Sequence, residues 1–314
     1  MVQELRGILG EYLPGVAMVK GSIDTLVVGR VVFTRDECSR GVLIASGGKG
    51  EVLVEAIRVG NRIHVPTSSI KGVFRRVGKA IAKSAASSLP EPEKSILLAH
   101  CEPDDEGVAH VCYDITHLLN VLKDRESVRL LAERGYVPGD AVDEIFSQLV
   151  SEDRRGVKRV EPLLAQLCPV CRVFGGPGLA GKLRILRVML SSDDLSKAID
   201  RLAHTSIDRS RRVALEGALF VEEYVDLKRI VVEFVARNVA QGSIDYRLLM
   251  SMLSTLKEVP LLLGHSKSRG LGWYRLDTAE TRLVYLDLTK MQSLHQFLNA
   301  ILNPFSYGEE VKIC

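Results

Sequence analysis

Long hydrophobic runs are missing from this sequence of 314 residues. A membrane-spanning helix needs roughly 18 consecutive apolar residues, and charged residues interrupt every hydrophobic stretch before that length. The opening residues 1–7 also lack the basic end and apolar block of a signal peptide. These absences argue against a membrane partner and predict a cytoplasmic location.

Aromatic residues and familiar catalytic motifs are scarce as well. Phe, Trp and Tyr make up 5% of the residues, which leaves few side chains for stacking on nucleic-acid bases. No G-x-S-x-G, H-E-x-x-H or Walker pattern occurs. Residues 176–181 do read G-x-G-x-x-G, but no strand signal precedes them and Pro177 disfavours the close turn. The pattern therefore does not indicate a dinucleotide site.

The composition is that of a globular protein with an uneven choice of cation. Hydrophobic residues make up 46% and charged residues 26%, which excludes a disordered chain, and the length fits two domains or one domain with a large insertion. The net charge of +3 indicates no partner, but 27 of the 42 cations are Arg, which is suited to bidentate contacts with phosphate. Asn and Gln total only 11, as in many proteins from hot habitats.

The clearest local signal is a helix that follows a short extended segment. Pro66 keeps Val65 extended, and Thr67 or Ser68 is expected to cap the helix that begins there. Apolar residues then recur at helical spacing, which predicts a buried face. That stripe consists of Ile70, Val73, Phe74, Val77 and Ile81.

The order of the other elements predicts an α+β fold. Residues 16–34 are rich in Val and Ile and indicate one or two strands before the helix. Strand signals return at 183–190, 218–225 and 230–237, followed by a helix at 243–258 and a last strand at 273–276. This order is typical of a ferredoxin-like, RRM-like βαββαβ core. We expect three parts: 1–88 as the first part of the core, 89–172 as a mainly helical insertion, and 173–314 as the second part.

Four of the six cysteines form two groups at the edges of this insertion. Cys101 and Cys112 make the first group, and Cys168 and Cys171 make the second, a Cys-x-x-Cys knuckle. Together they predict a structural zinc site, in which His100 or His110 can replace one cysteine. Buried free thiols or a redox pair are the alternatives.

Three segments are rich in cations and predict a nucleic-acid interface. The first is the start and one face of the helix, where residues 66–84 carry five cations and no anion; a helix N-terminus also favours phosphate. The second is 201–212, and the third is the glycine-rich loop 264–272. A solvated helix face and a plain turn are the alternatives. The candidate RNA-binding residues are Ser68, Ser69, Lys71, Arg75, Arg76, Lys79, Arg209, Arg211, Arg212, His265, Lys267 and Arg269.

Four segments, in order, resemble motifs of the RAMP superfamily of CRISPR-associated RNA-binding proteins. Residues 65–75, Val-Pro-Thr-Ser-Ser-Ile-Lys-Gly-Val-Phe-Arg, are similar to the family signature I-P-G-S-S-L-K-G-x-x-R. Residues 168–175 resemble C-x-x-C-x-L-F-G, residues 207–220 resemble I-D-R-x-T-G-x-A-x-x-G-x-L-F, and residues 264–272 resemble the family's glycine-rich loop. Within the superfamily, the chain looks most like the repeating backbone subunit of type III (Csm or Cmr) effector complexes.

This resemblance implies a subunit whose copies stack along a CRISPR RNA, beside other effector subunits, while a target RNA pairs with the guide. It also implies an aspartate that cuts target RNA with a divalent metal such as Mg²⁺, in a loop before the serine motif. That loop, residues 46–61, contains Glu51 and Glu55 but no Asp, which leaves Asp36 as the candidate. The alternatives are a RAMP-type endoribonuclease acting on CRISPR or target RNA, and a zinc-stabilised scaffold without RNA.

Overall fold

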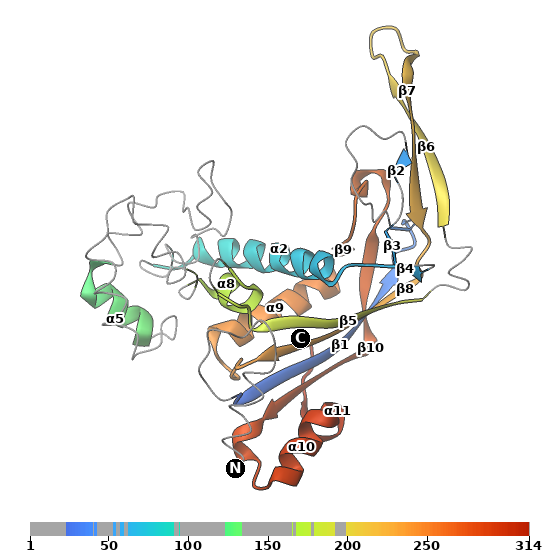
Figure 1. Ribbon diagram of the computed structural model, residues 1–314. Helices are drawn as coiled ribbons and strands as arrows, with labels where there is room; N and C mark the ends of the chain where they lie inside the picture. The colour runs from blue at the N-terminus through green and yellow to red at the C-terminus, as the bar shows by residue number, and fades with distance from the viewer. Residues whose placement is uncertain are drawn as a thin grey trace.

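A computed structural model describes residues 23–39, 41–42, 53–54, 57–59, 62–90, 94, 123–133, 165, 168–176, 179–191 and 199–313. Its centre is a six-stranded antiparallel sheet in the order β11-β10-β1-β8-β5, with β9 also paired to β10 (Figure 1). The strands are β1 (Thr25–Arg35), β5 (Leu183–Ser191), β8 (Arg229–Arg237), β9 (Leu261–Leu262), β10 (Trp273–Asp287) and β11 (Glu309–Glu310).

Strand β1 lies in the middle of this sheet, where its two runs of apolar residues are largely buried and its single glycine makes room for a ring. Val27 pairs with Ala236 and Phe33 with Ile230, and all four side chains are buried. A Cβ atom at Gly29 would lie 2.3 Å from the ring of Phe234. Glycine at this position therefore lets the ring pack directly against the backbone of β1.

Three helices pack together with this sheet around the main core. They are α2 (Thr67–Ala86), α8 (Pro169–Phe174) and α9 (Ile244–Glu258). The predicted apolar stripe of α2 is confirmed: Ile70, Val73 and Phe74 are buried, and the Phe74 ring lies 6.2 Å from that of Phe33. Helix α2 contacts both α9 and β5. Because β5 is the strand at one edge of the sheet, α2 lies beside that edge.

A buried carboxylate joins α8, α9 and the beginning of β5. Asp245, in the first turn of α9, is 3% exposed. It accepts hydrogen bonds from Arg172 Nε at 2.9 Å and from Lys182 Nζ at 2.5 Å. Arg172 lies in α8 and Lys182 precedes β5, so one side chain fixes three elements relative to one another.

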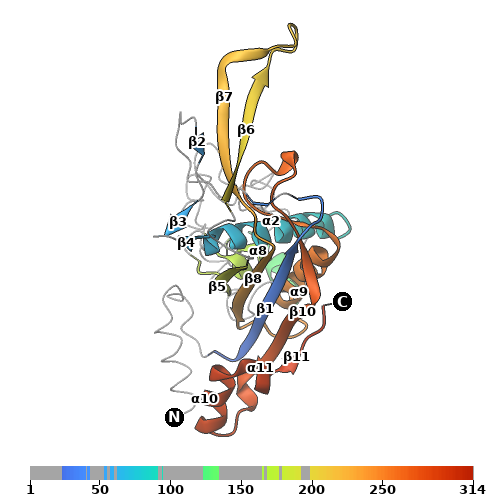
Figure 2. The same cartoon turned by 90° about the vertical axis from the view of Figure 1, so that its right-hand side faces the viewer.

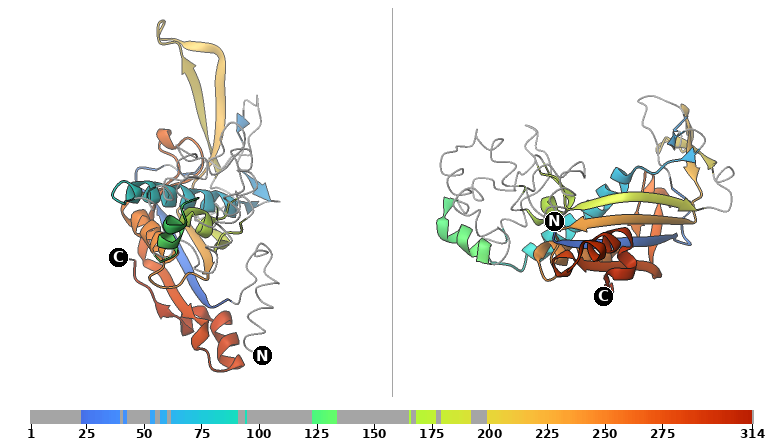
Figure 3. Two further views of the ribbon diagram at one scale, coloured as in Figure 1. Left: turned by 90° about the vertical axis from the view of Figure 1, so that its left-hand side faces the viewer. Right: turned by 60° about the horizontal axis from the view of Figure 1, so that its bottom comes forward.

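A second, smaller core lies where the C-terminal helices cover part of the sheet. Helices α10 (Leu294–Leu302) and α11 (Pro304–Tyr307) follow a short 3₁₀ turn, η4 (Leu288–Lys290). Phe297 and Ala300 of α10 pack in one cluster with Leu26 of β1. The right panel of Figure 3 shows α10 across the sheet, where β5, β8, β1 and β10 lie side by side.

A long hairpin projects away from the body of the molecule. It consists of β6 (Ile199–Ile207) and β7 (Ala214–Val225), which pair antiparallel, and β2 (Leu53–Val54) pairs parallel to β7. Figures 1 and 2 show the turn of this hairpin far from the main sheet in both views. The remaining elements described are β3 (Arg58–Val59), β4 (Arg62–Ile63) and α5 (Arg125–Glu133).

The predicted α+β class is confirmed, and most predicted elements are present at nearly the predicted bounds. Two are different from the prediction: β10 continues to Asp287 rather than ending at 276, and residues 201–207 are a strand of the hairpin. Within the segment 89–172, expected to be a mainly helical insertion, the described residues include α5 and the beginning of α8, and most of the segment lies outside the described residues. None of the described helices is long and apolar enough to cross a membrane.

Candidate nucleic-acid interface

The start of α2 presents backbone donors that no side chain caps. The N-cap residue is Pro66, and no side-chain hydrogen bond closes this end; the expectation that Thr67 or Ser68 caps the helix is therefore wrong. Thr67 is instead the first helical residue, because Pro66 holds the extended conformation and leaves the hydroxyls of Thr67 and Ser68 inside the first turn. The first turn also contains no acidic residue. Such an end favours an anion through its free N–H groups and its dipole.

Next to this helix start is a cleft of about 630 Å³ whose polar lining is cationic or hydroxylic. It lies where α2 passes the edge strand β5 and reaches the end of β8. Burial, and then repulsion from Arg75 and Arg184, lowers the pKa of Lys71. Burial, and then repulsion from Arg184, lowers the pKa of Arg237. The lining residues are Thr67, Ser68, Lys71, Arg184, Ile185, Leu186, Val235 and Arg237.

The other predicted cations of α2 point to different neighbours. Arg75 donates from Nη2 to the Sγ atom of Cys171 at 3.7 Å, so it faces α8. Arg76 is exposed and lies close enough to Lys267 to lower the pKa of that lysine, although burial of Lys267 is the larger cause. The structure thus brings the glycine-rich loop to α2 at Arg76. Lys79 is half-buried one turn further along, and Ser69 is half-buried beside Ser68.

The glycine-rich loop is a tight structure that contains the short 3₁₀ helix η3 (Lys267–Arg269). Gly272 has φ +76°, and a Cβ atom there would lie 1.9 Å from the carbonyl oxygen of Leu263. The Trp273 indole donates to the carbonyl of Lys267 at 3.0 Å, which holds the turn against β10. His265 and Arg269 are exposed on this loop.

The basic segment 201–212 forms one strand and the turn of the projecting hairpin. Arg209, Arg211 and Arg212 lie in or beside the turn and are exposed. Asp208 accepts from the backbone N–H groups of Ser210 and Arg211, which closes the turn. Three apolar side chains near it are also exposed, at 63%, 55% and 48%; they are Ile207, Val213 and Leu215. Exposed apolar residues beside Arg are typical of a binding surface.

The base of the hairpin is bound to the glycine-rich loop by one carboxylate. Glu222, a buried residue of β7, accepts from Ser266 Oγ at 3.0 Å and from Arg269 Nη1 at 3.4 Å. His204 of β6 lies 3.0 Å from the same carboxylate. No motif in the sequence singles out Glu222, and only the pairing of β6 with β7 places it opposite the loop.

Asp36, the candidate for RNA cleavage, holds the end of β1. Its carboxylate accepts from the backbone N–H of Cys38 at 3.0 Å and forms an ion pair with Arg275. These contacts, led by the bond from Cys38, lower the pKa of Asp36 although the group is buried. A structural role accounts for this geometry, and Mg²⁺-dependent cleavage by Asp36 stays a prediction. Glu51 and Glu55 lie outside the described residues.

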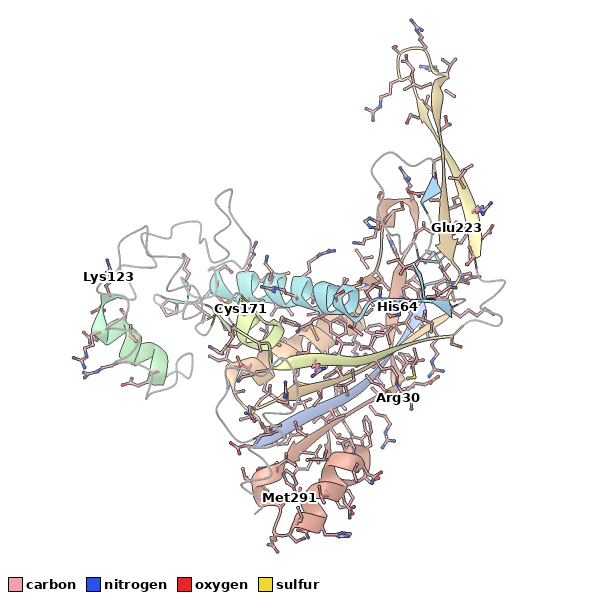
Figure 4. The ribbon with its side chains drawn as sticks, viewed as in Figure 1. Arg30, His64, Lys123, Cys171, Glu223 and Met291 are labelled. Atoms are coloured by element: carbon pink, nitrogen blue, oxygen red, sulfur yellow. The ribbon has the colours of Figure 1, made fainter. Side chains whose placement is uncertain are left out.

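The knuckle Cys168–Cys171 forms the start of α8, where Cys171 is labelled in Figure 4. Cys168 is the N-cap of α8, Pro169 follows at the first helical position, and both cysteines are buried. The guanidinium of Arg75 near Cys171 Sγ suits a thiolate. Cys101, Cys112, His100 and His110 lie outside the described residues, so the zinc site stays a prediction.

This α+β fold, with its cationic cleft and Arg-rich hairpin turn, defines a candidate polyanion-binding protein. The family model of the RAMP superfamily matches residues 24–275, which is most of the chain, and the protein therefore belongs to that superfamily. Members are generally associated with the binding and processing of CRISPR RNA. No curated protein sequence matches the chain.

Proposed function

We propose that the protein is a CRISPR RNA-binding backbone subunit of a type III interference complex, Csm or Cmr, that holds guide RNA and positions target RNA. The observation that carries this proposal is the cationic cleft at the uncapped start of α2 in a member of the RAMP superfamily. Phosphate contacts supply most of the sequence-independent affinity for RNA, and a guide of any sequence requires that kind of binding.

The core of this subunit is ferredoxin-like and RRM-like in the proposal. Elements β1, α2, β5, β8, α9 and β10 follow the order βαββαβ. In the sheet, the four strands of this core lie in the order β10-β1-β8-β5, which is fourth, first, third and second in chain order. This arrangement supports a split βαβ fold. The β6–β7 hairpin is then an insertion between the second and third strands, and 89–172 an insertion between the first helix and the second strand.

The projecting hairpin supports an assembly with other copies of the chain and with other effector subunits. Its exposed turn combines three Arg side chains with three apolar ones and contacts nothing in the described part of its own body. Because Glu222 fixes its base to the glycine-rich loop, the turn is presented at a set distance from the cleft. An RNA that lies along the cleft and loop of one copy can therefore meet the hairpin of a neighbouring copy.

A binding experiment with single-stranded RNA tests the proposal. A Lys71→Glu variant is expected to bind fluorescently labelled RNA at least tenfold more weakly at about 0.15 M salt, since an attractive contact in the cleft becomes repulsive. Lys290→Glu is the matched control, because Lys290 is exposed beside Asp287 next to α10 and its loss changes the same charge. RNA co-purifying with the wild-type protein would agree with the proposal. Unchanged affinity of the Lys71→Glu variant would overturn it.

Zinc in the knuckle is a separate part of the proposal. The buried pair Cys168 and Cys171 would supply two thiolates, and Cys101 and Cys112, or one of the two His residues, would complete the set. Metal analysis of the purified protein should give about one zinc per chain, and Cys171→Ser should remove it. Less than about half an equivalent, unchanged in that variant, would contradict the assignment.

A further inference from the structure

Arg237 is a buried cation whose position in the core needs an explanation. It is the last residue of β8, it is 8% exposed, and its Nη1 atom has no hydrogen-bond partner in the described part of the chain. A buried charged donor without a partner is costly, because it loses its hydration and regains no hydrogen bond. The side chain lines the cleft beside α2, where a ligand can reach it.

The neighbours of Arg237 increase this electrostatic cost. Arg184 is close enough to lower the pKa of both Arg237 and Lys71. The described residues that line the cleft include these three cations and no acid. The positive charge there is therefore offset by none of the lining side chains.

The opposite wall of the cleft is the first turn of α2. Thr67 and Ser68 line the cleft, and the N-terminus they belong to has neither a side-chain cap nor an acidic residue. The hydroxyls and free N–H groups of this turn are donors, as are the guanidinium and ammonium groups across from them. Donors and positive charge thus come from α2, β5 and β8 together.

We propose that this cleft seats one phosphate group of the RNA, with Arg237 and Arg184 on one side and Lys71 and the start of α2 on the other. The inference rests on the proposed RNA-binding function and adds two residues that no motif marks. Phosphate fits because its oxygens can accept from several donors at once, and because its charge offsets the buried guanidinium. The group is either a phosphodiester of the RNA backbone or a terminal phosphate.

The test uses Arg237→Met in the full-length protein, because Met keeps much of the side-chain volume without the charge. If Arg237 serves a ligand, the variant should melt at the same temperature as the wild type or higher in the absence of RNA. Its affinity for RNA should fall about tenfold or more, and the slope of log K against log salt should decrease by about 0.7. Arg187→Met is the control, because Arg187 is exposed on β5, is paired with Glu233 and lies outside the cleft lining.

Two further arms identify the phosphate and protect the test against a folding defect. RNA with a 5′-phosphate and RNA with a 5′-hydroxyl are compared: a loss of affinity with both indicates a backbone phosphodiester, and a loss with only the first indicates the terminal group. Lys71→Met, on the other wall, should produce the same change in salt slope. If the wild type binds RNA and Arg237→Met binds it with the same affinity, the phosphate site in the cleft is refuted, but the proposed function is not. A sharply lower melting temperature of Arg237→Met also overturns the phosphate site, and absence of wild-type RNA binding overturns both.

Discussion

Replacing Asp245 by alanine tests how much the buried carboxylate between α8, α9 and the start of β5 stabilises the fold. Its side chain is 5% exposed, and those of its partners Arg172 and Lys182 are 12% and 30% exposed. Removing the acid leaves a nearly buried guanidinium without its counter-ion, which typically costs about 3–5 kcal/mol. Loss of the acidic group from the first turn of α9 adds up to about 1 kcal/mol. We therefore expect the free energy of unfolding to fall by about 4 kcal/mol.

Guanidinium chloride unfolding at pH 7, followed by circular dichroism, measures this difference. An exposed ion pair provides the control: Arg187 and Glu233 lie 2.8 Å apart with side chains that are 62% and 24% exposed. Glu233→Ala should therefore cost no more than about 1 kcal/mol. Combining Asp245→Ala with Arg172→Met should restore part of the loss, because the cation that paired with Asp245 is gone. A loss below about 1 kcal/mol for Asp245→Ala would refute the reasoning from burial.

Three other outcomes can be measured separately. Gly272→Ala should lower the unfolding free energy by about 3 kcal/mol or more in the same assay, because its φ is positive and the new Cβ would meet the Leu263 carbonyl; a neutral result would contradict this. Arg211→Ala with Arg212→Ala should weaken RNA binding and reduce the salt slope by about 1.4, without changing the melting temperature; an unchanged slope would remove the hairpin turn from the interface. Asp36 has a lowered pKa, so its stabilising effect is complete above about pH 4 and is lost as the pH falls through the folded-state pKa. Between about pH 4 and pH 2, the unfolding free energy of Asp36→Asn should therefore fall less steeply with decreasing pH than that of the wild type. An identical pH dependence in the two proteins would show that Asp36 contributes nothing.

Sequence patterns identified the fold class because periodic burial depends on local spacing. The stripe from Ile70 in α2 and the alternation in β8 are both signals of this kind, and both elements lie within a few residues of their predicted bounds. The hairpin strand β6 was missed because its burial pattern contains no buried residue, so its pairing with β7 leaves no hydrophobic alternation. Local patterns cannot detect a strand that is held by pairing alone.

The candidate site was only partly predictable for a related reason. Ser68 and Lys71 belong to a motif and could be named from the sequence, whereas Arg184 and Arg237 each stand alone in a strand. They join the cleft only because β5 and β8 are neighbours in the sheet. An isolated Arg in a strand has no local signal that separates it from an ordinary surface residue. A buried guanidinium without a partner becomes visible only once the tertiary structure is known.

The central position of β1 affects how the protein folds during its synthesis on the ribosome. Its two neighbours in the sheet, β8 and β10, are synthesised long after it, and Thr25 pairs with Asp287. The apolar side chains of β1 therefore have no partner strand until β8 and β10 have been synthesised. Contacts so distant in sequence fold slowly and leave intermediates prone to aggregation. Truncation before β10 would remove one of the two strands that pair with β1 and leave that edge of β1 exposed.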